Sequence, residues 1–213
     1  MYGAQAAKIA AMLNISLEQA QAVIDAFWDS NLGLKGRKEA LEKFWEMTGK
    51  RFIYGLDGRK IWTRSKHSLL NAFQQNGGAS LFDLVGILLH WQLVKRGWYD
   101  EGARRIIYYH DEYQLQVPKH FMKKWEFDVL DEAEAFAKSL RDQGRHIDGH
   151  KRFTKEDDGS ITEIRNENGK FEVIYCPVGE MVVKCVEKAA QMMGSPVHIT
   201  GDYLTGTNWA TCH

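Results

Sequence analysis

Apolar residues recur along the chain at two spacings, one typical of helices and one typical of strands. Helical spacing predicts helices over residues 3–14, 16–28, 35–47, 66–75, 80–96, 131–141 and 178–193. Ser16 and Gln19 stand at the positions of a capping box at the start of the second helix. Gly77-Gly78 separates the fourth helix from the fifth, and Gly97 ends the fifth, which is predicted to be long and buried.

Strand-like runs predict two hairpins. Residues 51–54 and 60–63 flank Asp57-Gly58, and an Asp-Gly pair between two such runs is a strong hairpin signal. Residues 104–109 and 112–117 flank His110-Asp111, which puts the acidic pair Asp111-Glu112 at the tip of the second hairpin. Three further features are weaker: a turn at Asp158-Gly159 or at Asn168-Gly169, and a strand near residues 197–200.

These elements predict an α+β fold in three parts. Residues 1–50 are helical, residues 51–118 and 177–213 mix helices with a small antiparallel sheet, and residues 119–176 read as a charged, irregular insertion. The chain has 213 residues, of which 44% are hydrophobic, so it is long enough to bury a core.

Charge is balanced overall and uneven locally. Basic and acidic residues number 28 each, yet residues 35–67 hold ten lysines and arginines against four acids. That stretch is either a solvated face or a surface that meets an anion such as a DNA backbone. Three cysteines without short spacing disfavour a disulfide framework, and the longest apolar run, around residues 84–89, is too short to span a bilayer. The sequence therefore predicts a soluble, cytoplasmic protein with no membrane association.

The tip of the second hairpin carries the candidate chemistry. A carboxylate at such a joint is held by strands on both sides and stays open to a divalent cation and a phosphate. Asp111 could instead be an ordinary turn residue. One aspartate cannot hold two metals, so metal-dependent phosphoryl transfer here requires a second acid from elsewhere.

His67, Asn71 and Gln75 are spaced at i, i+4 and i+8 on a predicted helix and would share one face over roughly 12 Å. Such a row of hydrogen-bonding groups can contact the acceptors in a DNA minor groove without reading sequence. The spacing alone favours an ordinary polar face. Two other sets of residues could be either functional or structural. Zinc ligation by His146, His150, Cys176 and Cys185 is disfavoured by their irregular spacing, and Trp91, Trp98 and Trp125 are predicted to be packing residues.

Four ordered motifs resemble the C-terminal part of a family A DNA polymerase, most of all the replicative enzymes of short-tailed phages. They are GLDGRK at 55–60, RSKHSLLNAFQQ at 64–75, HDE at 110–112 and NWATCH at 208–213. The resemblance covers residues 2–118 and 177–213. It implies that residues 1–50 are the helical remainder of the fingers, packed on a palm whose hairpin carries His-Asp-Glu.

The resemblance also implies roles for individual residues. Asp111 matches the palm aspartate that binds both catalytic magnesium ions, and Glu112 the supporting acid beside it. The matches for contacts to primer-template DNA are His67, Asn71, Gln75, His110 and Arg64. Tyr2 and Gly3 match the end of the fingers helix near the templating base, and His213 matches the last residue of the palm.

The family's triphosphate-gripping residues, first palm aspartate and thumb have no counterpart in these residues. Met1 stands directly before the matched Tyr2-Gly3, inside a motif, and offers no nucleophile for protein splicing. The resulting hypothesis is a C-terminal subunit of a split DNA-directed DNA polymerase, active with dNTPs only as a heterodimer with an N-terminal fragment that supplies the second aspartate. Its setting would be the cytoplasm of a phage-infected bacterium. The alternative is a non-catalytic DNA-binding or assembly module derived from a polymerase.

Overall fold

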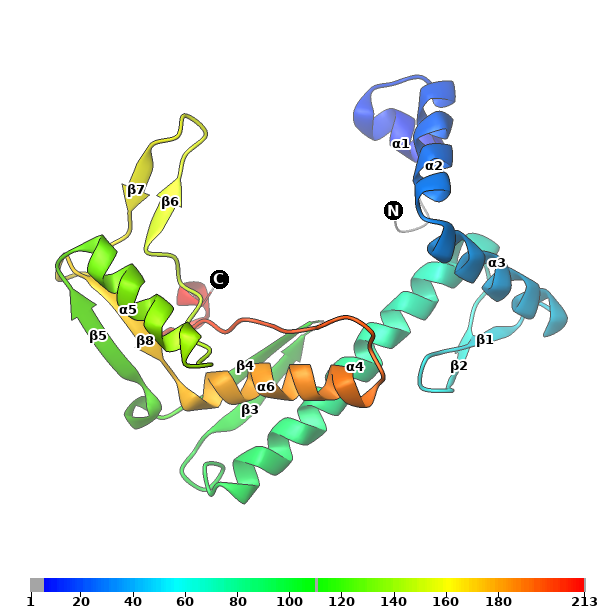
Figure 1. The fold of residues 1–213 in the computed structure, drawn as a ribbon. Helices are drawn as coiled ribbons and strands as arrows, with labels where there is room; N and C mark the ends of the chain where they lie inside the picture. The colour runs from blue at the N-terminus through cyan, green and yellow to red at the C-terminus, as the bar shows by residue number, and fades with distance from the viewer. Residues whose placement is uncertain (1–5, 110, 213) are drawn as a thin grey trace. The chain divides into compact units, whose positions relative to one another are not determined.

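The computed structural model describes residues 6–109 and 111–212 (Figure 1). Tyr2, Gly3, His110 and His213 lie outside the described residues. The chain forms two compact units, Met1–Ser80 and Leu81–His213. The described residues combine helices with two-stranded antiparallel sheets, which confirms the α+β class. The assignment of fingers, palm and insertion to particular ranges stays a prediction.

Three helices open the first unit: α1 (Ala6–Leu13), α2 (Leu17–Ser30) and α3 (Leu32–Met47). The predicted capping box is present at α2, where the Ser16 hydroxyl accepts from the Gln19 N–H at 3.1 Å and the Gln19 side chain accepts from the Ser16 N–H at 3.0 Å. Helix α3 begins three residues before its predicted start. Gly33 and Gly36, which weaken helical propensity, obscured that first turn in the sequence.

The predicted Asp-Gly hairpin is confirmed. Strand β1 (Phe52–Tyr54) pairs antiparallel with β2 (Lys60–Trp62), with Ile53 opposite Ile61. Ile53 is fully buried in the core of this unit, together with Leu41, Trp45 and Leu69. Because side chains alternate along a strand, the burial of Ile53 fixes which face of the hairpin is left outside.

The hairpin turn is anchored by Asp57. Its carboxylate accepts hydrogen bonds from the Arg59 N–H at 3.0 Å and from the Ser80 hydroxyl at 2.8 Å, and it also pairs with the Arg59 guanidinium. These donors hold the pKa of Asp57 well below its usual range. The turn is therefore tied to the helix that carries Ser80.

That helix, α4 (Leu69–Lys95), runs without interruption through Gly77-Gly78, so the prediction of two helices over residues 66–75 and 80–96 was wrong. A separate 3-10 turn, η1 (Lys66–Ser68), precedes it. Gly77 serves packing: a Cβ there would lie 2.7 Å from Cδ1 of Leu56 in the hairpin turn. A glycine in a helix interior lowers helical stability relative to alanine, but it allows a neighbouring segment to approach the helix closely.

The continuous helix also changes the membrane prediction. By length and composition alone, Lys66–Lys95 is apolar and long enough to cross a membrane, as are core helices of many soluble proteins. The sequence prediction considered only the longest uninterrupted apolar run, around residues 84–89, and α4 extends well beyond that run on both sides. In the second unit Val85, Leu89 and Leu93 of this helix are buried in the core.

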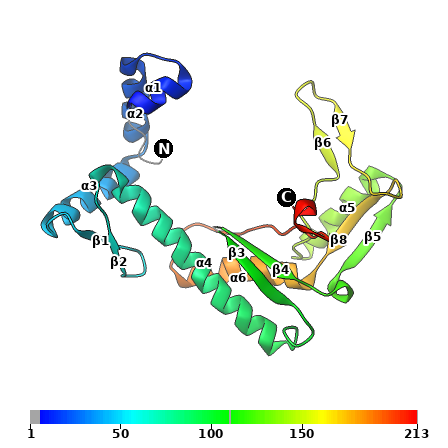
Figure 2. The same cartoon turned by 180° about the vertical axis from the view of Figure 1, so that it is seen from behind.

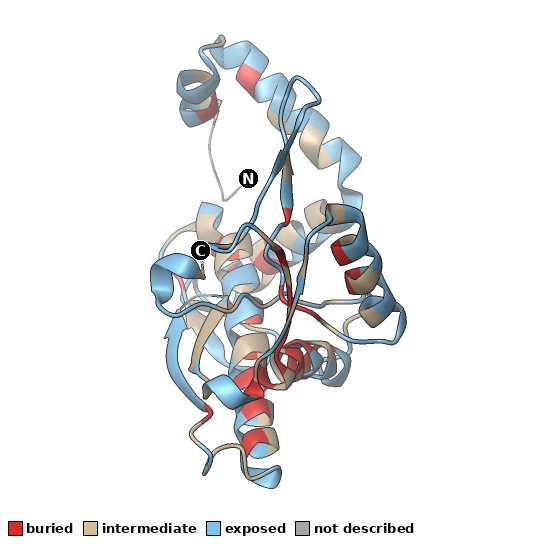
Figure 3. Ribbon diagram, turned by 90° about the vertical axis from the view of Figure 1, so that its left-hand side faces the viewer, coloured by how far each residue is buried: buried red, intermediate tan, exposed pale blue. Residues whose placement is uncertain are grey.

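The main core of the second unit joins α4 to α6 (Pro177–Met192) and to the hairpin of β3 (Arg104–Tyr109) and β4 (Glu112–Gln116). Helix α6 and the glycine after it, Gly194 with φ 72°, match the sequence prediction. The buried positions form short interrupted bands along the ribbon, as expected for elements with one face in the core (Figure 3). The core residues are Val85, Leu89, Leu93, Ala103, Phe121, Cys176, Val178, Cys185, Val186 and Ala189.

The β3–β4 hairpin lies directly against α4 (Figure 2). The Tyr113 hydroxyl donates to the carbonyl of Phe82, and the Phe82 ring stacks on Tyr108 at 6.2 Å. Gly86 makes this approach feasible, because a Cβ at that position would lie 3.0 Å from the Tyr113 hydroxyl and closer still to the Arg105 guanidinium. The hairpin is therefore held at a fixed place on the helix.

Residues 119–176 are more regular than their charge suggested, and the helix predicted over residues 131–141 is present. After the turn η2 (Lys119–Phe121), strand β5 (Lys123–Phe127) pairs antiparallel with β8 (Phe171–Tyr175), and α5 (Leu130–Asp142) packs on them. A separate core of Ala133, Ala137, Ile147, Phe171 and Val173 lies between them. Apolar residues on one face of each short element build this core. The charged residues on the other face made the segment read as irregular in the sequence.

Two turn predictions in that region fare differently. Strands β6 (Phe153–Lys155) and β7 (Ile161–Glu163) form a hairpin around Asp158-Gly159. Asn168-Gly169 lies in a turn that leads into β8, whose partner is β5. The strand predicted near residues 197–200 is absent, since no described strand lies beside it. The chain there is an extended tail, held by the Thr200 hydroxyl donating to Glu187, and it ends in η3 (Trp209–Thr211).

The two glycine environments of α4 predict opposite effects of alanine. Gly78→Ala should raise the free energy of unfolding by about 0.5–1 kcal/mol, because a Cβ there meets open space and alanine favours the helix. Gly86→Ala should be less stable than Gly78→Ala by roughly 1 kcal/mol or more, since the hairpin must move. Urea unfolding curves of both variants test this, and an equal gain at Gly86 would contradict the close approach.

Candidate functional site

The candidate site is built at the tip of the β3–β4 hairpin. Tyr109 pairs with Glu112 across the ladder, which leaves His110 and Asp111 as the two-residue connection. Asp111 is exposed in this turn, whereas the structure of His110 is outside the described residues. The predicted acidic tip is thus present, with its first carboxylate open to solvent.

Glu112 begins β4 beside Asp111 and is half-buried. Its Oε1 accepts a hydrogen bond from the Gln114 side chain at 3.0 Å. The different environments fit two different roles: the exposed carboxylate is free to bind a ligand, and the half-buried one is oriented by its neighbour.

The strands that carry this tip are rigid on the side facing α4. Burial raises the pKa of Tyr113, with the nearby Tyr108 acting in the same direction. The Tyr113 ring also receives the Arg105 guanidinium at 5.4 Å. A neutral, hydrogen-bonded tyrosine therefore joins the hairpin to the helix.

Magnesium is the ion that the resemblance implies, and the donor set is compatible with it. Mg²⁺ prefers oxygen ligands and is commonly held by one or two carboxylates together with substrate phosphates. Asp111 and Glu112 offer such oxygens. Within residues 6–109 and 111–212, no three His, Cys, Asp or Glu side chains come together to hold a metal by themselves.

Four of the residues predicted to contact DNA, namely Arg64, His67, Asn71 and Gln75, lie in the first unit. His67 lies in η1 rather than in the helix, with Nδ1 2.7 Å from the Ser65 hydroxyl. Asn71 and Gln75 follow in α4 at i and i+4, hence on one face. Arg64 and Gln75 are exposed, whereas the Oδ1 of Asn71 is buried without a hydrogen-bond partner in the described chain.

Of the three tryptophans predicted to pack, two do. Trp98 contacts Phe121 edge-on at 5.5 Å, and Trp125 contacts Phe136 at 5.0 Å. Trp91 is 71% exposed, so for this residue the prediction was wrong. It lies on the side of α4 that faces away from the core.

The four residues considered as zinc ligands lie in different environments. Cys176 and Cys185 are buried in the apolar core, where burial raises the pKa of both thiols, that of Cys185 to about 11. His150 lies with Nδ1 2.6 Å from Asp148, and His146 lies 3.6 Å from Glu187.

Asp148 is a residue that the sequence analysis missed. It is only 3% exposed, and its carboxylate accepts hydrogen bonds from the Thr205 N–H and hydroxyl, both at 2.6 Å, and from the His150 N–H at 2.9 Å. The other ring nitrogen of His150 lies 3.0 Å from the carbonyl of Thr211. One buried carboxylate thus anchors the C-terminal tail, and no local sequence signal marks an aspartate as buried.

The anchored tail ends close to the acidic hairpin. Burial raises the pKa of the Cys212 thiol, and the negative charges of Asp148 and, more weakly, Glu112 act in the same direction. Charges influence a thiol in this way only at short range. The tail that Asp148 fixes therefore forms part of the surroundings of the candidate site.

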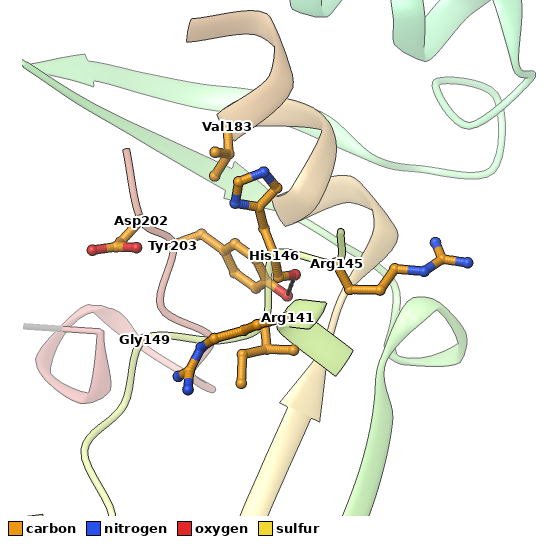
Figure 4. Close-up of a pocket in the computed structure, with 8 residues that line it drawn as sticks. Arg141, Arg145, His146, Gly149, Val183, Asp202 and Tyr203 are labelled. Atoms are coloured by element: carbon orange, nitrogen blue, oxygen red, sulfur yellow. Dashed lines mark hydrogen bonds between the residues drawn. The ribbon is translucent and has the colours of Figure 1, made fainter. Parts of the chain in front are cut away.

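A pocket of about 190 Å³ lies on the other side of this anchor (Figure 4). Its lining includes Arg141, Arg145, His146, Asp202 and Tyr203. The two guanidinium groups extend in opposite directions, and that of Arg145 pairs with Glu180 at 3.4 Å. The cations do not converge on one point, and the pocket contains neither Asp111 nor Glu112.

Comparisons with known proteins point to polymerases. No protein-family model matches the chain. It is 27% identical over 152 residues to the DNA-directed DNA polymerase of Enterobacteria phage T3, covering 62% of this chain and 21% of that protein. It is 28% identical over 134 residues to the DNA-directed DNA polymerase of Escherichia phage T7, covering 54% and 18%. The chain is thus similar over part of its length to phage DNA polymerases and spans about a fifth of the length of these curated relatives.

The anchoring role of Asp148 predicts a large effect of its removal. Asp148→Ala leaves the Thr205 and His150 donors unpaired and should lower the free energy of unfolding by roughly 3 kcal/mol, with faster amide exchange at Thr205. The exposed Asp202, three residues before Thr205, is the matched control, and Asp202→Ala should change stability by less than about 0.5 kcal/mol. Equal unfolding curves for both variants would contradict the anchor.

Proposed function

We propose that this chain is the C-terminal subunit of a DNA-directed DNA polymerase that adds dNTPs to a primer 3′ end by two-metal-ion phosphoryl transfer. The observation that carries the proposal is the exposed Asp111 at the tip of a hairpin fixed to α4, in a chain related to phage DNA polymerases. The resembled family uses an aspartate at this point of the motif for the same purpose.

Asp111 and Glu112 are the proposed metal-binding and catalytic acids. Two magnesium ions held there would stabilise the negative charge that develops on the oxygens of the transferred phosphoryl group and on the attacking and leaving oxygens. Asp111, which is exposed, would donate its carboxylate to both ions. Glu112, oriented by Gln114, would support the site from the neighbouring position. The primer 3′ oxygen forms the new bond to the α-phosphorus of the nucleotide, and the bond to pyrophosphate breaks.

The second aspartate is proposed to come from outside these residues, on an N-terminal companion chain. The open surface of β3 supports such a partner. All six residues of the strand are exposed, including Ile106, which is 62% exposed, and Ile107. Among the described strands β3 pairs with β4 alone, so its other edge offers unpaired N–H and C=O groups. An added strand would cover this edge and bring its own side chains next to the acidic tip.

Primer-template DNA is the proposed macromolecular substrate, with His67, Asn71, Gln75, Arg64 and His110 as contacts carried over from the resemblance. Arg64 and Gln75 are exposed and could contact DNA as they stand. Tyr2 and Gly3 are proposed to lie near the templating base. The proposed setting, as for the phage relatives, is the cytoplasm of an infected bacterium.

Removal of the charge at Asp111 tests the chemistry. Asp111→Asn keeps the size of the side chain and should slow primer extension by the reconstituted polymerase roughly a thousandfold, the factor expected when several kcal/mol of metal-mediated stabilisation is lost. Asp100→Asn, an exposed aspartate in the turn before β3, is the matched control and should extend primers normally. Retained activity in Asp111→Asn would refute the assignment. DNA binding without extension in the presence of every companion would favour the non-catalytic module.

Disruption of the open strand tests the companion. Ile106→Lys places a charge on the apolar surface of β3 and should weaken binding to the N-terminal companion at least about tenfold in a pull-down titration or calorimetry. Ile161→Lys, at a similarly exposed isoleucine on β7, should leave the affinity unchanged. If both variants bind alike, the companion does not dock on β3.

A further inference from the structure

One face of the β1–β2 hairpin gathers aromatic rings. The register places Phe52 opposite Trp62 and Tyr54 opposite Lys60, and all four side chains lie on the face opposite the buried Ile53. The ring centroids of Phe52 and Trp62 are 5.4 Å apart, and those of Phe52 and Tyr54 are 5.5 Å apart. This aromatic face consists of Phe52, Tyr54, Lys60 and Trp62.

The outer rings of the aromatic face are open. Trp62 is 67% exposed and Tyr54 is 46% exposed, while Phe52 is half-buried beneath them. Large aromatic side chains left on a surface in a group are typical of binding sites, because their contact with water is unfavourable until a partner covers them. The two exposed rings are diagonal neighbours on the hairpin, a relation that sets side chains roughly 7–8 Å apart. Each can therefore contact a separate flat group.

Positive charge surrounds these rings. The Lys60 ammonium lies 4.8 Å from the centre of the Phe52 ring. Lys50, Arg51 and Arg64, which flank the two strands, are exposed and form no ion pair with any described residue. The acids nearby are already paired, Asp57 with Arg59 and Glu46 with Lys66. The charge left over at the ends of the two strands is positive.

We propose that the aromatic face binds single-stranded nucleic acid, with unpaired bases stacked on Trp62 and Tyr54 and phosphates near Lys60 and its cationic neighbours. Exposed rings inside a cationic surface are the combination used by proteins that bind single strands without reading sequence. Bases in a duplex are stacked on each other and cannot cover these rings, whereas an overhang can. The inference goes beyond the proposed polymerase activity and does not involve Asp111.

The test compares variants of the full chain for affinity to a labelled oligothymidylate of about 12 nucleotides, a length within the usual site size. Fluorescence anisotropy should give a dissociation constant about tenfold higher for Trp62→Ala, as expected for one lost stacking contact. Trp62→Phe retains a ring and should stay within about threefold of the unmodified chain. Lys60→Gln should reduce the slope of log affinity against log salt by about 0.7, one phosphate contact on a single strand.

Trp91→Ala is the matched control, since Trp91 is exposed to a similar degree on a different surface, and it should bind like the unmodified chain. Asp111→Asn should also bind normally, which separates a failure of this inference from a failure of the proposed function. Equal affinities of Trp62→Ala and Trp91→Ala would overturn the proposal. An equal loss of affinity for a blunt duplex would overturn it too, as would burial of Trp62 by the companion chain without DNA, seen as protection from iodide quenching.

Discussion

The close contact between the β3–β4 hairpin and helix α4 is the constraint on which the candidate site depends. A two-stranded ribbon is at best marginally stable in water on its own. Here Gly86 lets the hairpin approach the helix, and Tyr113 fixes it by donating to the carbonyl of Phe82. The strands then hold Asp111 at their tip, beyond the reach of the core. The hairpin that carries the exposed carboxylate is thus held by a half-buried tyrosine and by the absence of a side chain at Gly86.

The same arrangement leaves the other side of the hairpin open. Packing against α4 uses one surface, and among the described strands β4 alone pairs with β3, in which Ile106 and Ile107 are exposed. An open, apolar edge is a hazard for an isolated chain and a binding surface for a partner. The proposed second acid and the exposed strand are independent arguments for a partner at the same hairpin.

The sequence was sufficient to predict features that depend only on residues close together in the chain. The capping box at Ser16 and the Asp57-Gly58 turn involve residues within a few positions of each other, and both were predicted. Features that depend on residues far apart in the sequence were missed. Gly77 lies inside a continuous helix and leaves room for Leu56, which lies 21 residues earlier. The carboxylate of the buried Asp148 is bound by Thr205 in the tail. For the site, the strand pattern placed Asp111 and Glu112 at a hairpin tip, and the resemblance added their proposed roles. The tail anchor and the exposure of Trp62 and Trp91 depend on tertiary packing and were not predicted.

Exposure distinguishes the two surfaces that remain available for function. Exposure of a charged side chain such as Asp111 to water has little free-energy cost, so its exposure alone shows only that a ligand can reach it. Trp62 and Tyr54 are different, since their exposed rings would be stabilised by any flat, apolar partner. The cations around them make an anionic partner with flat groups the best match, and single-stranded nucleic acid has both properties. In the proposed polymerase, the template strand ahead of the primer would be such a partner. The proposed role of the aromatic face in the first unit would then complement the proposed role of Asp111 in the second, and no contact between the two units is required.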